Sequence, residues 1–193
     1  NYTSITGRKI PITIYSKFRF RNWLFKKKTL KVMKEMERDY GAYPHPQLIV
    51  YGTKLKGGME YVGATATSWI SLGHEIHHQY FAKGVMPADG NSGWMDEAIA
   101  SWRDKGYQVH NKPDYFSFNL AKHNVYTRKT DDNSYEKGRT FMAYLDFQLK
   151  QVGLPGLKNF LSEFFQKYNH QLVTTQDFKR DLEGHSNIDF TDD

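Results

Sequence analysis

The sequence predicts an α+β domain, in which a small sheet lobe of about residues 1–66 is followed by a mainly helical lobe of about residues 67–193. Two observations predict this class. Short apolar runs bounded by turn residues come first along the chain, and helical hydrophobic periodicity dominates afterwards. The chain has 193 residues, of which 39% are hydrophobic and 16% aromatic, so it is long enough for one domain with a substantial core.

In the N-terminal lobe, predicted strands flank one long helix. Lys9–Tyr15 (KIPITIY) is predicted as a strand, and Trp23–Tyr40 as an amphipathic helix because its apolar residues recur between charged ones. Gln47–Tyr51 (QLIVY) predicts a second strand. A pair of glycines then interrupts the pattern, and Met59–Ala64 is predicted as an edge strand.

The C-terminal lobe is predicted to be helical, with sequence signals for several helix starts. Asn91 or Ser92 can cap one helix, and the polar run 130–134 another. Thr174, followed by Asp177 three residues later, resembles a capping box for a short last helix. The other helices are predicted over residues 68–81, 93–106, 135–152 and 155–168.

Composition excludes several kinds of site. The chain contains no cysteine, which rules out disulfides, thiolate metal sites and a cysteine nucleophile, so any metal must be held by histidine and carboxylate. No stretch approaches the roughly 18 apolar residues of a membrane helix, and we expect no membrane segment in this chain. Because the chain shows no signal peptide and does not begin with methionine, we expect it to be a processed product or a fragment excised from a larger protein.

The formal net charge is +6, and the densest basic run is residues 19–28 (RFRNWLFKKK). Cations mixed with aromatic residues suit single-stranded nucleic acid, which keeps a nucleic-acid-binding function open as an alternative. No nucleic-acid motif accompanies the run, however. We therefore interpret it as a solvated surface around the start of a helix and expect no nucleic-acid partner.

The most informative segment is residues 74–78 (HEIHH), which satisfies the pattern H-E-x-x-H. On a helix, residues four apart share a face, so His74 and His78 can ligate one zinc ion. Glu75 projects in a neighbouring direction, where it can act as the base toward a water molecule without ligating the metal. Chance alone would produce this pattern in roughly one of a hundred such chains, so a third ligand is needed as a test.

Glu97 is the predicted third ligand. Catalytic zinc commonly takes three protein groups, and Glu97 follows His78 after a gap of eighteen residues. Choosing His77 instead of His78 would spoil this gap and leave no glutamate in the catalytic position, so we interpret His77 as a flanking residue. Asp96 is either a hydrogen-bond partner of a ligating histidine or an ordinary helix-start carboxylate.

With these ligands, the sequence resembles the aminopeptidase N family of gluzincin metallopeptidases, whose zinc signature is H-E-x-x-H-x18-E. Gly57-Gly58-Met59-Glu60-Tyr61 is similar to the family's exopeptidase motif G-A-M-E-N. Residues 134–138 (SYEKG) are similar to the segment that carries the family's catalytic tyrosine, and weaker similarities extend the resemblance over most of the chain.

The resemblance implies a thermolysin-like catalytic domain with one zinc ion per chain. It implies that Tyr135 donates a hydrogen bond to the developing oxyanion and that Glu60 binds the free α-amine of the substrate. Gly57, Gly58 and Met59 would bind the substrate backbone. Position 61 is tyrosine where the family usually has asparagine, and the flanking domains usual in the family do not fit in this length.

The function predicted from these residues is zinc-dependent hydrolysis of peptide bonds, with removal of N-terminal residues from a peptide that has a free N-terminus. We expect a monomer. The alternative is a pseudoenzyme or peptide-binding module that keeps the zinc site without turnover. The sequence does not indicate the cellular compartment.

Overall fold

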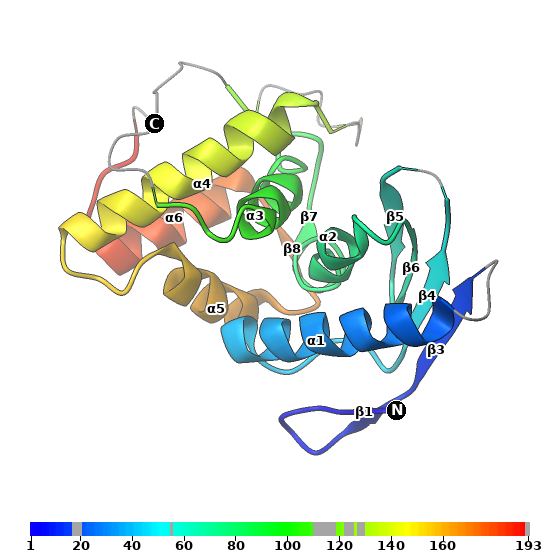
Figure 1. The fold of residues 1–193 in the computed structure, drawn as a ribbon. Helices are drawn as coiled ribbons and strands as arrows, with labels where there is room; N and C mark the ends of the chain where they lie inside the picture. Colours follow the sequence, from blue (N-terminus) through cyan, green and yellow to red (C-terminus); the bar gives the residue numbers. More distant parts are fainter. Residues whose placement is uncertain (17–20, 55, 110–118, 122–125, 127–129, 192–193) are drawn as a thin grey trace. The chain divides into compact units, whose positions relative to one another are not determined.

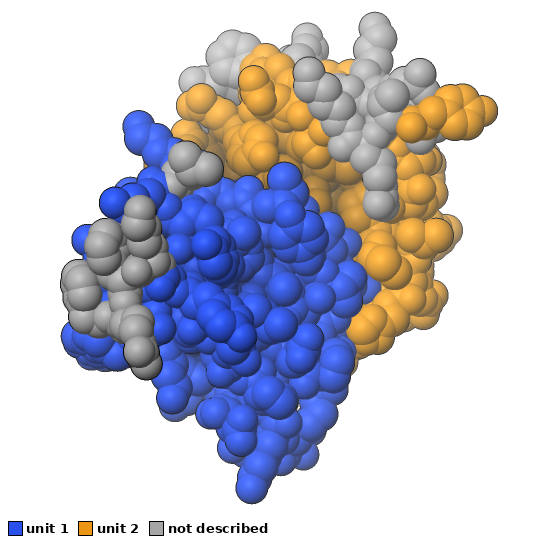
Figure 2. Space-filling view, turned by 90° about the vertical axis from the view of Figure 1, so that its right-hand side faces the viewer, with its two compact units in different colours: residues 1–84 blue, residues 85–193 orange. Residues whose placement is uncertain are grey.

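The described residues form α-helices and small β-sheets, which confirms the α+β class. The structure is a computed structural model of the chain (Figure 1) and describes residues 1–16, 21–54, 56–109, 119–121, 126 and 130–191. Residues 19 and 20 of the basic run therefore lie outside the described residues. The chain divides into two compact units, residues 1–84 and residues 85–193 (Figure 2).

Unit 1 contains a four-stranded sheet in the order β3-β4-β6-β5 and a separate antiparallel pair, β1 and β2. β3 and β4 are parallel, so they need a crossover connection, which α1 supplies. The elements of unit 1 are β1 Tyr2–Thr3, β2 Lys9–Ile10, β3 Ile12–Ser16, α1 Asn22–Tyr40, β4 Leu48–Gly52, β5 Gly58–Tyr61, β6 Ala64–Thr67 and α2 Leu72–His77.

Two strand predictions need correction. The strand predicted over Lys9–Tyr15 is split into β2 and β3 at Pro11, because proline cannot donate to a strand ladder. Met59–Ala64 was predicted as one edge strand, whereas a turn at Gly63, where φ is 65°, separates the edge strand β5 from β6. The ATAT sequence of β6 lacks the large apolar residues by which strands are usually recognised.

The core of unit 1 lies between α1, the sheet and α2. The amphipathic pattern predicted for α1 is confirmed, since Phe25, Val32, Met33 and Met36 are all buried. α2 packs on α1 and on strands β5 and β6. This packing places the helix that carries the H-E-x-x-H pattern in unit 1, and the boundary between the units follows Gly84.

α2 is shorter than the helix predicted over residues 68–81. Before it, the Ser68 hydroxyl accepts a hydrogen bond from the Ser71 N–H and holds a turn. After it, Ala82 has a φ of 135°, which ends any helical path, and the Lys83 N–H donates to the His78 carbonyl. Apolar residues continue past the end of the helix because Tyr80 and Phe81 are also buried, whereas Trp69 and Ile70 before the helix are exposed.

Unit 2 is mainly helical. α3 and α4 pack closely because α4 carries Gly138, where a Cβ atom would lie 2.7 Å from the Ala98 Cβ. The elements of unit 2 are β7 Met86–Pro87, α3 Met95–Asp104, α4 Asn133–Gln151, α5 Leu157–Tyr168, β8 Leu172–Val173 and α6 Thr175–Ser186, with β7 and β8 parallel. No helix in the described part of the chain is long and apolar enough to cross a membrane.

The helix starts of unit 2 agree only in part with the predicted caps. The capping box of Thr174 and Asp177 is confirmed. The predicted cap of α3 is wrong: the helix begins after Trp94 without a side-chain cap within the described residues. The Ser92 hydroxyl instead donates to Asp89 and accepts from the Thr175 N–H. The Ser92 hydroxyl oxygen, which would accept a hydrogen bond in a local cap, thus bonds to Thr175, 83 residues later in the chain.

The predicted cap of α4 lies in the expected polar run but is not a side-chain cap. Asp132 is the cap residue, and its side chain makes no capping hydrogen bond within the described residues. The neighbouring Asp131 carboxylate accepts a hydrogen bond from the Asn133 N–H. The polar run therefore satisfies one N–H of the first turn through the residue that precedes the cap.

Candidate metal centre

The two histidines of the H-E-x-x-H pattern lie side by side in unit 1. His74 is on α2 and His78 directly follows the helix, and their ring centroids are 4.7 Å apart. A ring nitrogen of His74 lies within 4.8 Å of a ring nitrogen of His78. His78 Nδ1 is 3.3 Å from the Phe81 carbonyl oxygen, so Nε2 is the nitrogen with which it would ligate a metal.

His77 points into the aromatic core of unit 1. Its ring stacks on Phe81 with centroids 5.5 Å apart and meets Tyr40 edge-on at the same distance. The side chain is fully buried, and Nε2 lies 3.4 Å from the Tyr40 hydroxyl. These contacts support the interpretation of His77 as a flanking core residue rather than a ligand.

Strand β5 passes directly over the Glu75 side chain. Glu75 is buried, and a Cβ atom at Gly58 would lie only 2.5 Å from its carboxyl carbon. Glycine at position 58 therefore lets the strand backbone approach the carboxylate, and an alanine there would require Glu75 to shift. The sequence predicts that Gly58 contacts the substrate. The structure adds the close approach of Gly58 to Glu75, the predicted base.

Glu60 lies near Glu75 on the helix-facing side of β5. Three potential ligand atoms lie within 4.8 Å of one another here, one each from Glu60, Glu75 and His78. The Lys83 ammonium pairs with Glu60 at 3.3 Å. Lys83 belongs to no motif, and sequence reasoning missed it because the residue that it contacts is 23 positions away.

The other residues of the GGMEY segment have different surroundings. Successive side chains of a strand point to opposite faces, so Met59 and Tyr61 project away from the face that carries Glu60. Both are more than half exposed. Gly57 is exposed with a φ of 81° at the turn before β5. Tyr61, which stands where the G-A-M-E-N motif has asparagine, thus lies on the face of the strand opposite to the Glu60 carboxylate.

Gln79 holds the β5–β6 turn against the end of α2, and the sequence did not single it out. Its buried amide oxygen accepts a hydrogen bond from the Gly63 N–H at 2.9 Å. Its amide nitrogen donates to the carbonyls of Tyr61 and Ala64 at 3.0 and 3.2 Å. Gln79 directly follows His78, so the same short segment that carries the imidazole also fixes the hairpin that carries Glu60.

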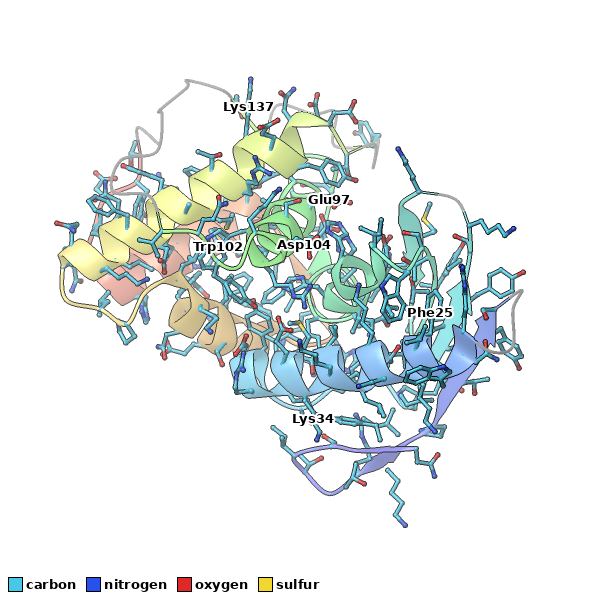
Figure 3. The ribbon with its side chains drawn as sticks, in the orientation of Figure 1. Phe25, Lys34, Glu97, Trp102, Asp104 and Lys137 are labelled. Atoms are coloured by element: carbon cyan, nitrogen blue, oxygen red, sulfur yellow. The ribbon has the colours of Figure 1, made fainter. Side chains whose placement is uncertain are left out.

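Unit 2 carries Glu97 and Tyr135. Glu97 lies in the first turn of α3 (Figure 3) and is half-buried. The Tyr135 hydroxyl on α4 donates a hydrogen bond of 2.8 Å to Glu97 Oε1. The Asp96 carboxylate accepts from the Glu97 N–H at 2.8 Å, which supports the interpretation of Asp96 as a helix-start carboxylate.

These donor groups fit zinc by their chemistry. Unit 1 offers two neighbouring imidazoles with a buried carboxylate beside them, and unit 2 offers a carboxylate that is held by a phenol. Neutral imidazole and carboxylate oxygen are ligands that catalytic zinc takes in proteins, typically three together. The two units, each taken by itself, therefore carry donor groups of the types that catalytic zinc takes, and none of them is a thiolate.

No protein-family model matches the sequence, and no curated protein does. Solved structures do match. Native yeast LTA4 hydrolase is 18% identical with a TM-score of 0.71, and the match covers 96% of this chain and 36% of that one. Aminopeptidase A from Legionella pneumophila, in complex with aspartic acid, is 17% identical with a TM-score of 0.68, covering 98% and 26%.

An M1 zinc metallopeptidase from Deinococcus radiodurans is 19% identical with a TM-score of 0.62, and the match covers 81% of this chain and 40% of that one. At this identity the likeness shows that the chain shares the fold of these metallopeptidases. The chain spans only about a quarter to two fifths of the length of the structures that it matches.

Proposed function

We propose that this chain is the catalytic domain of a zinc-dependent peptidase with a thermolysin-like fold, which removes residues from the amino end of peptides. The observation that carries the proposal is the pair of neighbouring imidazoles, His74 and His78, with the buried Glu75 carboxylate between them in the chain. The metallopeptidase fold of the solved structures supports it.

His74, His78 and Glu97 would hold one zinc ion. The eighteen-residue gap and the donor types support Glu97 as the third ligand. Bound zinc would supply Lewis-acid chemistry, which acidifies a water molecule and polarises a carbonyl group. The hydrogen bond from Tyr135 to Glu97 would orient this carboxylate before the metal binds.

Glu75 is the proposed general base. Its carboxylate would accept a proton from the attacking water and later deliver that proton to the leaving amine. Burial beneath β5 restricts the side chain to few positions, which favours a defined direction of proton transfer. Tyr135 would donate its hydroxyl proton in a hydrogen bond to the oxygen on which negative charge develops.

Glu60 is the proposed binding group for the substrate's α-ammonium. Its proximity to Glu75 and His78 supports this role, because the amine of the first residue lies only a few bonds from the scissile carbonyl. The Legionella structure holds aspartic acid, a free amino acid with an α-ammonium. The exposed edge of the sheet at β5 could pair with the backbone of an extended peptide.

The first experiment measures metal content and hydrolysis together. The chain incubated with zinc should bind one equivalent, and an anomalous difference map at the zinc edge should show which residues ligate it. Glu97→Ala should lose the metal, whereas Glu163→Ala, which changes an exposed glutamate on α5, should retain it. A metal on His77, or no bound zinc, would contradict the proposal.

The second experiment tests the reaction and its direction. We expect chelator-sensitive cleavage of a peptide with a free amino end and no cleavage of the same peptide when it is acetylated, analysed by mass spectrometry. Equal cleavage of both at internal bonds would retain zinc chemistry and reject the aminopeptidase assignment. Zinc binding without any cleavage would favour the alternative of a peptide-binding module.

A further inference from the structure

The carboxylate proposed to bind the substrate's ammonium is already paired with an ammonium of the chain itself. Lys83 Nζ lies 3.3 Å from Glu60 Oε1. Only 25% of the Lys83 side chain and 21% of the Glu60 side chain are exposed, so the pair is largely withdrawn from solvent. Such a pair is screened less by water and salt than an ion pair on the surface.

The backbone after α2 brings Lys83 to this place. The Lys83 N–H donates to the His78 carbonyl at 3.0 Å, which attaches the lysine to the end of the histidine-bearing segment. The preceding residue, Ala82, is buried and has a φ of 135°, a region that residues with a side chain rarely adopt. Strain of this kind persists only where the surrounding structure holds it in place.

The charges around Glu60 explain why a cation is favoured there. Glu75 offers a second carboxylate within 4.8 Å, so the two acidic groups together attract a positive charge. A lysine ammonium and the amino end of a peptide are chemically the same group. Each can occupy the same charge-assisted hydrogen bond to a carboxylate, but not both on one oxygen in the same geometry.

We propose that Lys83 is an intramolecular competitor for the ammonium subsite at Glu60. This inference rests on the proposed role of Glu60 in the peptidase reaction. A substrate must displace the Lys83 ammonium before its own amino end can bind, so Lys83 weakens the binding of every ligand that carries a free amine. Lys83 thereby raises the KM and takes no part in the bond-breaking step.

The inference predicts a gain of affinity on removal of the lysine charge. Lys83→Met keeps the unbranched apolar stem of the side chain, is one atom shorter, and removes the ammonium. The affinity for a free-amine ligand should rise about tenfold, the order of one charge-assisted hydrogen bond. In hydrolysis, the KM should fall by a similar factor while kcat and zinc content stay unchanged.

Calorimetric titration of the zinc-loaded chain with L-leucinol tests this without turnover, because leucinol has an ammonium and no peptide bond. N-acetyl-L-leucinol, which lacks the ammonium, should bind Lys83→Met and the unaltered chain equally. Lys34→Met, which removes an exposed lysine of α1 (Figure 3), is the matched control and should change neither affinity. Lys83→Arg should keep the weak binding, and Lys83→Gln replaces Lys83→Met if that variant fails to fold.

Unchanged or weaker leucinol binding in Lys83→Met would overturn the inference, because it would show that Lys83 positions Glu60 rather than competes for it. An equal gain for the acetylated ligand would overturn it as well. The two proposals can fail separately. Tighter leucinol binding in a chain that hydrolyses nothing would retain the ammonium subsite and reject the peptidase. Hydrolysis by the chain, together with no effect of Lys83→Met on leucinol binding, would retain the peptidase and reject the competition by Lys83.

Discussion

Two carboxylates of unit 1, Glu37 and Glu60, differ in how the chain compensates their charge. Glu37 is buried at the end of α1 and accepts hydrogen bonds from fixed groups of its own unit. Glu60 is half-buried on an edge strand and pairs with one lysine. The donors to Glu37 are the Tyr2 hydroxyl, the Ser4 hydroxyl, the Ile5 N–H and the Tyr43 N–H.

The difference separates a structural carboxylate from one that can exchange its partner. The donors to Glu37 include backbone groups that cannot leave without local unfolding, so the carboxylate joins the N-terminal strands to α1. The pKa of Tyr2 is raised well above its usual range, by burial first and by the neighbouring Glu37 second. The partner of Glu60 is a flexible side chain that a ligand of the same charge can replace.

The largest expected effect follows from Glu75→Gln, in the region of Glu60. The amide cannot accept a proton from water, so hydrolysis should fall by about 10²–10⁴-fold while zinc binding persists. The measurement is kcat/KM with metal analysis of the same sample. Glu37→Gln is the matched control and should retain most of the activity. A Glu75→Gln variant with more than about a tenth of the original rate would exclude Glu75 as the general base.

Tyr135→Phe tests the part of the proposed site in unit 2. The variant removes a single hydrogen-bond donor, so kcat should fall by about 10²–10³-fold with little change in KM, as expected for a donor that acts only in the transition state. Steady-state kinetics on a free-amine peptide checks this. If only KM changed, Tyr135 would be a binding or packing residue, and its hydrogen bond to Glu97 would have to be explained by stability alone.

Glu37→Gln should change stability and leave the site intact. One carboxylate oxygen becomes an amide nitrogen, which faces donors and leaves the N–H of either Ile5 or Tyr43 without its acceptor. The expected loss is about 2 kcal/mol in the free energy of unfolding, measured by urea denaturation. Leucinol affinity should not change. A large loss of leucinol affinity with normal stability would show that Glu37 contributes to ligand binding, as is proposed for Glu60, and is not a purely structural carboxylate.

The smallest expected effect comes from Ala82→Gly, in the turn that presents Lys83 to Glu60. Glycine adopts a φ of 135° without strain, and relief of this strain should outweigh the added flexibility of the unfolded chain. We expect a gain of about 1 kcal/mol in the free energy of unfolding. Lower stability would show that the turn is not strained and that the Ala82 side chain contributes packing.

Local features of the fold were predictable because short-range geometry encodes them. The amphipathic helix α1 follows from apolar spacing, and the capping box at Thr174 from a side chain three residues before its partner. Predictions failed where a distant group intervened. Ser92 bonds Thr175 instead of capping α3, and β6 forms between two strands although its own sequence has weak strand character.

Some features of the candidate site were likewise predictable from the sequence, and others were found only in the structure. The neighbouring placement of His74 and His78 follows from helical spacing, and their sequence pattern was sufficient to single them out together with Glu75. The contacts of Gln79 with the β5–β6 turn did not follow from any pattern. The placement of Glu97 as a third ligand stays a prediction, which metal analysis will test.

The sequence by itself determined the α+β class, the amphipathic α1, the C-terminal capping box and the neighbouring histidines, because each depends on backbone periodicity over a few residues. Only the tertiary structure decided that Gly58 lies over Glu75 and that Lys83 pairs with Glu60. Both contacts depend on the course of the chain between distant residues. One turn at Ala82, with a backbone angle that alanine rarely adopts, directs Lys83, and no periodic pattern encodes such an angle.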